Sequence, residues 1–204
     1  VERQLAISEA RAVAMFEHSP VLLWIEDFSA VKDRLDQLRA GGVTDLAAHL
    51  VAHPEVVTQA LGMIRVVDVN QRTLELYRAA SKQELIDRLD EVFRDAMEQH
   101  FAEDLLLMWS GTAGRETEGV NYALTGEPID IHMQWTVLPG HEERWDRALV
   151  SITDITARKR ADEYMRYLGT HDTLTGLFNR SYFDEQVRRM QTGPAQVSSL
   201  VIAD

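Results

Sequence analysis

Hydrophobic and polar residues follow two different periods along this chain of 204 residues. Residues 1–18 repeat apolar positions along one helix face, whereas 21–29 and 63–70 are short apolar runs with the length of buried strands. Between these runs, residues 29–62 carry three successive helical patterns. The first part of the chain therefore predicts a helix and then two strands with a helical segment between them.

Capping residues and proline indicate where the predicted helices begin. Ser29 and Thr44 are expected to cap the first two helices of this segment, and Pro54 to open the third. After the second strand we expect two short helices, of which the second begins with the capping box Ser81–Glu84. Residues 91–109 predict one long amphipathic helix.

The pattern then changes to strict alternation, which is typical of half-buried strands. Residues 116–128 and 129–140 predict two strands separated by a Gly-Glu-Pro turn, and residues 145–156 predict a third. The order of elements predicts an α+β fold with a five-stranded antiparallel sheet and helices on one face. The apolar face of the strand at 129–140 consists of Ile129, Ile131, Met133, Trp135 and Val137.

Charge and composition exclude several classes of function and of binding site. Lys and Arg number 21 against 33 Asp and Glu, a formal net charge of −12 that argues against nucleic-acid binding. The absence of cysteine excludes disulfides, thiolate metal sites and cysteine nucleophiles. The longest apolar runs are too short to cross a bilayer and no signal peptide is visible, which predicts a cytoplasmic protein. The chain begins with Val1 rather than with methionine, so this expectation covers only the printed residues.

Residues 15–156 resemble a PAS sensor domain. The resemblance rests on the order of elements, on the segment VVDVNQRTLELYRAAS, and on Asp154–Thr156, which is similar to the D-x-T junction between PAS domains and their output helix. It implies an N-terminal helix at 1–18 and a sensor domain at 19–156. PAS domains ordinarily have a tight hairpin between their first two strands. The helices at 29–62 are then either an insertion or a sign that the first strand is misassigned.

A charged helix at 157–169 is expected to link the sensor domain to the next domain. Its apolar positions are spaced four, three and four residues apart, as in a short coiled-coil seam. This spacing favours pairing with a second copy of the helix, and we therefore expect a homodimer. The seam consists of Ala157, Ala161, Tyr164 and Leu168.

The segment HDTLTGLFNR is similar to the opening motif D-x-L-T-G-L-x-N-R of GGDEF domains, the catalytic domains of diguanylate cyclases. The matching residues are Asp172, Leu174, Thr175, Gly176, Leu177, Asn179 and Arg180. Asp172 and Arg180 flank a turn that a charge-assisted hydrogen bond between them would close. Gly176 permits a backbone conformation that other residues resist. The motif is thus expected to be structural, with no catalytic residue in this chain.

The resemblance covers residues 170–204 and implies the truncated start of a GGDEF domain, with its first helix and first strand. It also implies that Asp204 is the first ligand of two magnesium ions, and that two such domains condense two GTP molecules into cyclic di-GMP. The expected function is sensory control of a diguanylate cyclase. The alternative is a sensory and dimerisation module attached to an inactive GGDEF domain, with or without a phosphodiesterase domain downstream.

The sequence does not identify the ligand of the sensor domain. The alternatives are non-covalent flavin, haem, a small metabolite and no ligand. Trp24, Trp109 and Trp135 are candidates to line its pocket, although buried tryptophan more often belongs to the core. Without cysteine, a flavin–cysteinyl adduct is excluded. His49 and His53 have a metal-ligand spacing but lack the glutamate of H-E-x-x-H, so a surface or capping role is favoured.

Two further histidines are weaker candidates. His132 is expected on the outer face of its strand, away from any core cofactor. His171 precedes an acidic residue, as the phosphoacceptor of a sensor kinase does, but the proline that such a site needs is missing.

Overall fold

The computed structural model describes residues 2–94 and 97–192. Contacts between residues divide the chain into two compact units: unit 1, Val1–Ile155, and unit 2, Thr156–Asp204. Asp204, the expected magnesium ligand, and the strand expected to end on it lie outside the described residues.

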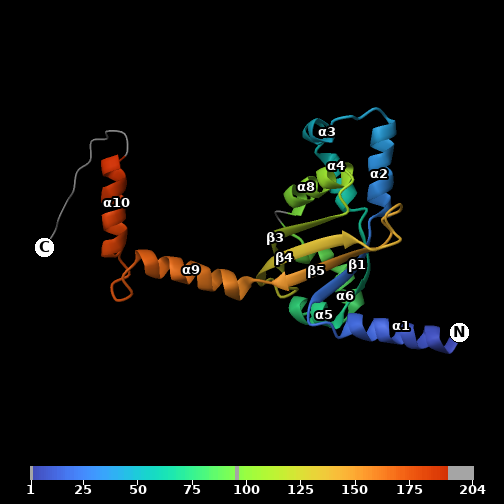
Figure 1. The fold of residues 1–204 in the computed structure, drawn as a ribbon, viewed down its shortest axis with the longest axis horizontal. Helices are drawn as coiled ribbons and strands as arrows, with labels where there is room; N and C mark the ends of the chain where they lie inside the picture. The colour runs from blue at the N-terminus through green and yellow to red at the C-terminus, as the bar shows by residue number, and fades with distance from the viewer. Residues whose placement is uncertain (1, 95–96, 193–204) are drawn as a thin grey trace. The chain divides into compact units, whose positions relative to one another are not determined.

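Unit 1 is built on a five-stranded antiparallel sheet (Figure 1). The α+β class and the five antiparallel strands expected from the sequence are confirmed, and on β4 the predicted apolar face is buried apart from the half-buried Met133. The spatial order of the strands is β2-β1-β5-β4-β3. Their bounds are β1 (Leu22–Asp27), β2 (Arg65–Val69), β3 (Gly114–Tyr122), β4 (Pro128–Val137) and β5 (Ala148–Asp154).

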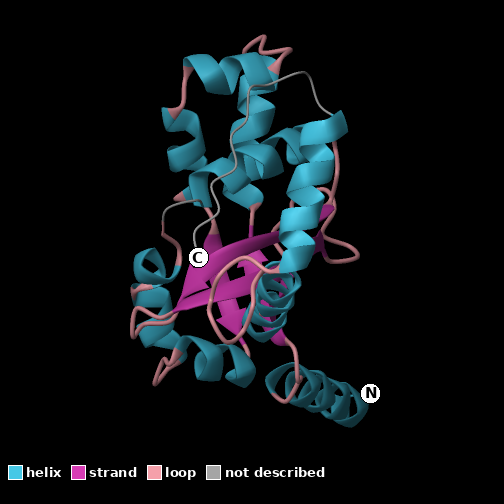
Figure 2. Cartoon of the chain, turned by 90° about the vertical axis from the view of Figure 1, so that its left-hand side faces the viewer, coloured by secondary structure: helices cyan, strands magenta, loops and turns pink. Residues whose placement is uncertain are grey.

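Helices fill the long connections of unit 1. Three of them separate β1 from β2 in sequence, although the two strands pair directly. In Figure 1, α2, α3, α4 and α8 lie above the strands and α5 and α6 below them; Figure 2 shows the twisted sheet from a second direction. None of the helices in the described residues is long and apolar enough to span a membrane. The helices of unit 1 are α1 (Glu2–Glu17), α2 (Ser29–Ala40), α3 (Leu46–Ala52), α4 (Glu55–Leu61), α5 (Gln71–Tyr77), α6 (Lys82–Asp87), α7 (Leu89–Val92) and α8 (Met97–Trp109).

The capping box that opens α6 is confirmed. The Ser81 hydroxyl accepts a hydrogen bond from Glu84 N at 3.1 Å. In return, Glu84 Oε2 accepts one from Ala80 N at 2.7 Å. Ser81 therefore satisfies a backbone donor of the first helical turn, and Glu84 holds the backbone of Ala80, the residue before the cap.

The caps predicted at Ser29 and Thr44 are wrong. Asp45 caps α3, because its Oδ1 accepts a hydrogen bond from Ala48 N at 3.0 Å. At α2, Ser29 is the first helical residue, and Asp27 Oδ1 accepts a bond from its backbone N at 2.9 Å. In both places a neighbouring carboxylate, a stronger acceptor than a hydroxyl, takes the backbone donor.

The single helix predicted at 91–109 is also wrong. Helix α7 ends at Val92, because Phe93 adopts an extended backbone with φ −105° and ψ 93°. The Phe93 ring packs against Trp24, with a centroid distance of 5.8 Å, and α8 begins at Met97. A tertiary contact in the core thus overrides the local helical pattern.

Buried Asn70 joins three elements of unit 1. Its Oδ1 accepts hydrogen bonds from Leu23 N at 3.1 Å and from Thr73 N and Oγ1 at 3.1 and 2.9 Å. Its Nδ2 donates to the carbonyl oxygens of Phe16 at 3.1 Å and Val21 at 2.8 Å. One amide therefore ties the end of α1 and the start of β1 to the start of α5.

The ladder between β1 and β2 contains a β-bulge. Ile25 pairs with Asp68, but the next residue, Glu26, pairs with Val66, so Val67 is the extra residue on β2. On its other side, β1 pairs with β5 without interruption. The irregularity therefore lies directly beside Glu26, on the edge of the sheet.

Unit 2 contains α9 (Thr156–Thr170) and α10 (Arg180–Thr192), which the turn at 171–179 connects. No residue of α9 is buried. His171 and Phe178 form an isolated antiparallel bridge at the two sides of the turn.

Candidate functional site

A cavity of about 460 Å³ lies in unit 1, between the sheet and residues of α4, α7 and α8. Val150 on β5 pairs with both Trp24 on β1 and Trp135 on β4, so these three side chains form one row across the cavity face of the sheet. The volume falls within the range of about 300–1,000 Å³ that is typical of small-molecule sites. The cavity is therefore the candidate ligand site.

Of the three tryptophans expected at a pocket, Trp24 and Trp135 line this cavity. Trp109 does not: it stands at the end of α8, and the guanidinium of Arg39 lies over its ring at 4.3 Å from the centroid. Trp135 Nε1 donates a hydrogen bond to Asp104 Oδ1 at 3.2 Å. The indole N–H of fully buried Trp24 has no hydrogen-bond partner among the described residues.

Glu26 is the acidic residue that the sequence analysis missed. It lies two positions after Trp24 on β1, hence on the same face of the strand, and it lines the cavity. The side chain is half-buried, and its accessible part borders the cavity. Partial withdrawal from water beside apolar side chains raises the pKa of its carboxyl from 4.5 to about 7. A glutamate inside the apolar run VLLWIEDFS is the signal that would have pointed to it.

A second acidic residue of the cavity, Asp104, is paired. Besides the bond from Trp135, its Oδ1 accepts one from Arg115 Nη1 at 3.3 Å, and Arg115 also bonds Glu103. Burial raises the pKa of Asp104, while the partners Trp135 and Arg115 act in the opposite direction. Asp104 thus anchors α8 to β3 and β4.

In unit 2, Asp172 closes the turn of the opening motif. Its Oδ1 accepts hydrogen bonds from Leu174 N at 3.2 Å, from Thr175 N at 2.9 Å and from Thr175 Oγ1 at 2.8 Å. These bonds, that of the Thr175 hydroxyl first, hold the pKa of Asp172 below its ordinary value. The bond predicted between Asp172 and Arg180 is therefore wrong, because nearby N–H and O–H donors satisfy the carboxylate and Arg180 Nε lies 3.8 Å from Asp184.

Two other residues of the motif shape the turn. As the sequence predicts, Gly176 adopts a backbone that other residues resist, with a φ of +71°. Asn179 caps α10, since its Oδ1 accepts a hydrogen bond from Tyr182 N at 2.9 Å. Its Nδ2 donates to the carbonyl oxygens of Leu168 at 3.3 Å and His171 at 3.4 Å, which connects the two helices. Leu174 and Leu177 are exposed.

An aromatic column, which the sequence analysis missed, runs along this turn. His171 stacks on Tyr167 at 4.2 Å between centroids and lies 4.5 Å from Phe178. Phe178 stacks in turn on Tyr182 at 4.0 Å. His171 is therefore part of a structural contact between the ends of α9 and α10.

The expected seam of α9 lies at the surface of unit 2. Ala157, Ala161 and Tyr164 are exposed and Leu168 is half-buried. Of the D-x-T junction, Asp154 is the last residue of β5 and Thr156 the first of α9.

The described residues contain no group of three His, Cys, Asp or Glu side chains that could hold a metal ion. The rings of His49 and His53 lie 4.7 Å apart, and His53 Nδ1 is 3.3 Å from Glu55. His132 Nε2 lies 2.8 Å from Glu116 Oε1 on the neighbouring strand. None of the three lines the cavity.

No protein-family model matches the sequence, and no curated protein is significantly similar to it. Several solved PAS and LOV domains are similar in structure. The PAS domain of an HTR-like protein from Haloarcula marismortui is 20% identical, with a TM-score of 0.44 over 76% of this chain and 97% of that chain. A PAS domain from Colwellia psychrerythraea is 14% identical, with a TM-score of 0.49 over 74% and 99%. A LOV protein from Rhodobacter sphaeroides is 18% identical, with a TM-score of 0.49 over 79% and 73%. Since these identities lie below 25% and the TM-scores below 0.5, the PAS-like description rests on this chain's own strands and helices.

Proposed function

We propose that this chain is the sensory module of a cyclic di-GMP signalling protein, in which unit 1 binds the signal and unit 2 begins a diguanylate cyclase domain. The observation that supports this most is the continuity of four features along the chain. The cavity is lined by Val150 and Ile152 of β5. Strand β5 is followed after one residue by α9, and α9 by the turn of the GGDEF-like motif.

The physical route of the signal follows from this order. A ligand that binds better to one arrangement of β5 shifts the population toward that arrangement, and β5 passes directly into α9. The exposed seam of α9 pairs with a second copy, and the pairing brings two GTP-binding domains together. The GGDEF resemblance assigns Asp204 as the first Mg²⁺ ligand, and Mg²⁺ in such a site polarises the GTP α-phosphate.

The test is the activity of the parent protein, expressed from its gene. With Mg²⁺ and GTP it is expected to form cyclic di-GMP, and Asp204→Asn is expected to abolish product formation. Asp184→Asn is the matched control, because Asp184 is an exposed residue of α10 outside the motif. If the wild-type parent forms no product, the alternative holds: a sensory and dimerisation module on an inactive GGDEF domain.

Whether a cofactor is bound can be measured on the purified chain. An absorption spectrum separates flavin and haem from colourless ligands, and native mass spectrometry gives the mass of any molecule that co-purifies.

A further inference from the structure

Glu26 is an unpartnered acid at the wall of a mainly apolar cavity. Among the described residues, its carboxyl makes no hydrogen bond or ion pair. Polar groups withdrawn from water in folded proteins nearly always have partners, and exceptions point to a missing one. We propose that the cavity binds a small, largely apolar molecule carrying one cationic amino group, and that Glu26 holds this group.

The charges around the cavity favour a cation. The described residues of its lining include three carboxyl groups, Glu26, Asp90 and Asp104, and no Lys, Arg or His. Asp104 already has Arg115 and Trp135 as partners, and Asp90 is exposed. Glu26 is therefore the carboxyl that can accept an amine, whereas an anionic ligand would meet like charge without a counter-charge.

The apolar side chains that line the cavity favour a ligand that is largely apolar. Trp24, Trp135, Phe28, Phe93 and Phe101 line the cavity, together with aliphatic and methionine side chains. Aromatic faces attract cations as well as burying hydrocarbon, so they stabilise the amino group and the body of the same molecule.

The pKa of the Glu26 carboxyl fits this role. Burial raises its pKa to about 7, so the carboxyl is largely protonated in slightly acid solution. Among the described residues, the other titratable groups nearby are Asp90 and Asp104 at the cavity and Tyr77, whose hydroxyl accepts a hydrogen bond from Asn121 Nδ2. None of them brings a positive charge. An amine would supply it, and Glu26 would then ionise.

The inference deepens the proposed sensory function, on which its biological meaning rests, but its test needs only the chain itself. Isothermal titration calorimetry at pH 7.5 would compare hexylamine, 2-phenylethylamine and tryptamine. Their matched alcohols and carboxylic acids would be titrated in parallel. At least one amine is expected to bind with one-to-one stoichiometry and at least about tenfold more tightly than its alcohol.

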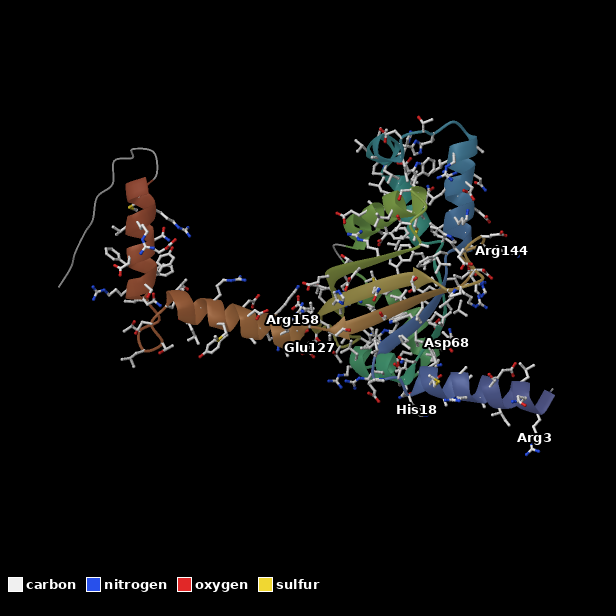
Figure 3. The ribbon with its side chains drawn as sticks, viewed as in Figure 1. Arg3, His18, Asp68, Glu127, Arg144 and Arg158 are labelled. Carbon is white, nitrogen blue, oxygen red and sulfur yellow. The ribbon has the colours of Figure 1, made fainter. Side chains whose placement is uncertain are left out.

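Variants assign the preference to Glu26. Glu26→Gln keeps the shape of the side chain and is expected to weaken amine binding at least about tenfold, while the alcohol binds as to wild type. Glu127→Gln is the matched control, because Glu127 is exposed in the turn between β3 and β4 (Figure 3). An alcohol or acid that binds as tightly as its amine overturns the proposal, as does unchanged amine binding by Glu26→Gln, or no binding by any amine at millimolar concentration. Cyclase activity of the parent is measured separately, so the two proposals can fail independently.

Discussion

The two units of this chain differ in the interactions that stabilise each of them. Unit 1 encloses a hydrophobic core and satisfies its buried polar groups through hubs such as Asn70. In unit 2, α9 buries no residue, and the turn is fixed by the hydrogen bonds of Asp172 and Asn179 and by stacked rings. Burial of apolar area is the main stabilising term in folding, so unit 1 has an independent source of stability that α9 and the turn of unit 2 lack.

This difference fits the task that we propose for each unit. A rigid core can hold a cavity of fixed shape, which recognition of a ligand needs. A helix with exposed apolar positions, such as α9, can pair with another surface or separate from it. Transmission of a signal needs such a change. The following changes break or sharpen this comparison, from the largest expected effect to the smallest.

Asn70→Ala is expected to lower the free energy of unfolding of unit 1 by about 3 kcal/mol or more, because several buried backbone and hydroxyl groups lose their partner at once. Urea unfolding followed by tryptophan fluorescence measures the loss. Asn121→Ala is the matched control, since Asn121 is also buried and its amide donates a hydrogen bond to Tyr77. An equal loss for both variants would contradict the role of Asn70 as a hub.

Glu26→Gln is expected to stabilise unit 1 in a pH-dependent manner. A carboxyl whose pKa is raised from 4.5 to about 7 on folding contributes stability below pH 4.5, and that contribution is lost as the pH rises through 7. The variant lacks this loss, so its advantage over wild type grows to at most about 3 kcal/mol at pH 8, less whatever solvent in the cavity screens. Urea unfolding between pH 4 and 8 checks this, and parallel curves for wild type and variant would contradict the burial of the carboxyl.

Asn179→Ala is expected to destabilise the start of α10 by about 1 kcal/mol, because the helix loses its cap. Limited proteolysis at the turn should accelerate about fivefold, while the urea midpoint of unit 1 stays unchanged. Asp184→Ala serves as the control, because Asp184 caps nothing and its contact with Arg180 is long and exposed. A simultaneous loss in unit 1 would show that the two units unfold together.

Charges on the seam are expected to leave the stability of the isolated chain within about 0.5 kcal/mol of wild type, since they alter exposed or half-buried positions. Ala161→Glu with Leu168→Glu should nevertheless abolish self-association in analytical ultracentrifugation, and with it signal-dependent cyclase activity of the parent. Arg166→Glu places the same charge on the opposite side of α9 and should preserve the dimer. Self-association or regulation that survives the double variant would rule out the seam.

Structural features that depend on a few neighbouring residues can be predicted from the sequence. The alternation of β4, the capping box at Ser81 and the positive φ of Gly176 depend on a few neighbouring residues, and all three are present. The break at Phe93 and the position of Trp109 depend instead on which distant side chains share the core. Glu26 shows the same limit: its place on a strand is local, but its burial depends on β5, β2 and three helices.

The β-bulge beside Glu26 has a kinetic consequence. Strand β2 is at the edge of the sheet, contributes Val66 to the cavity wall and is joined to β1 by a ladder that the extra residue Val67 interrupts. Beyond the interruption, the ion pair between Arg65 Nη2 and Asp27 Oδ2, 2.7 Å long, fastens its first residue. We therefore expect local separation of this short edge strand from β1, rather than separation of the packed helices, to be the faster route by which a ligand enters and leaves the cavity.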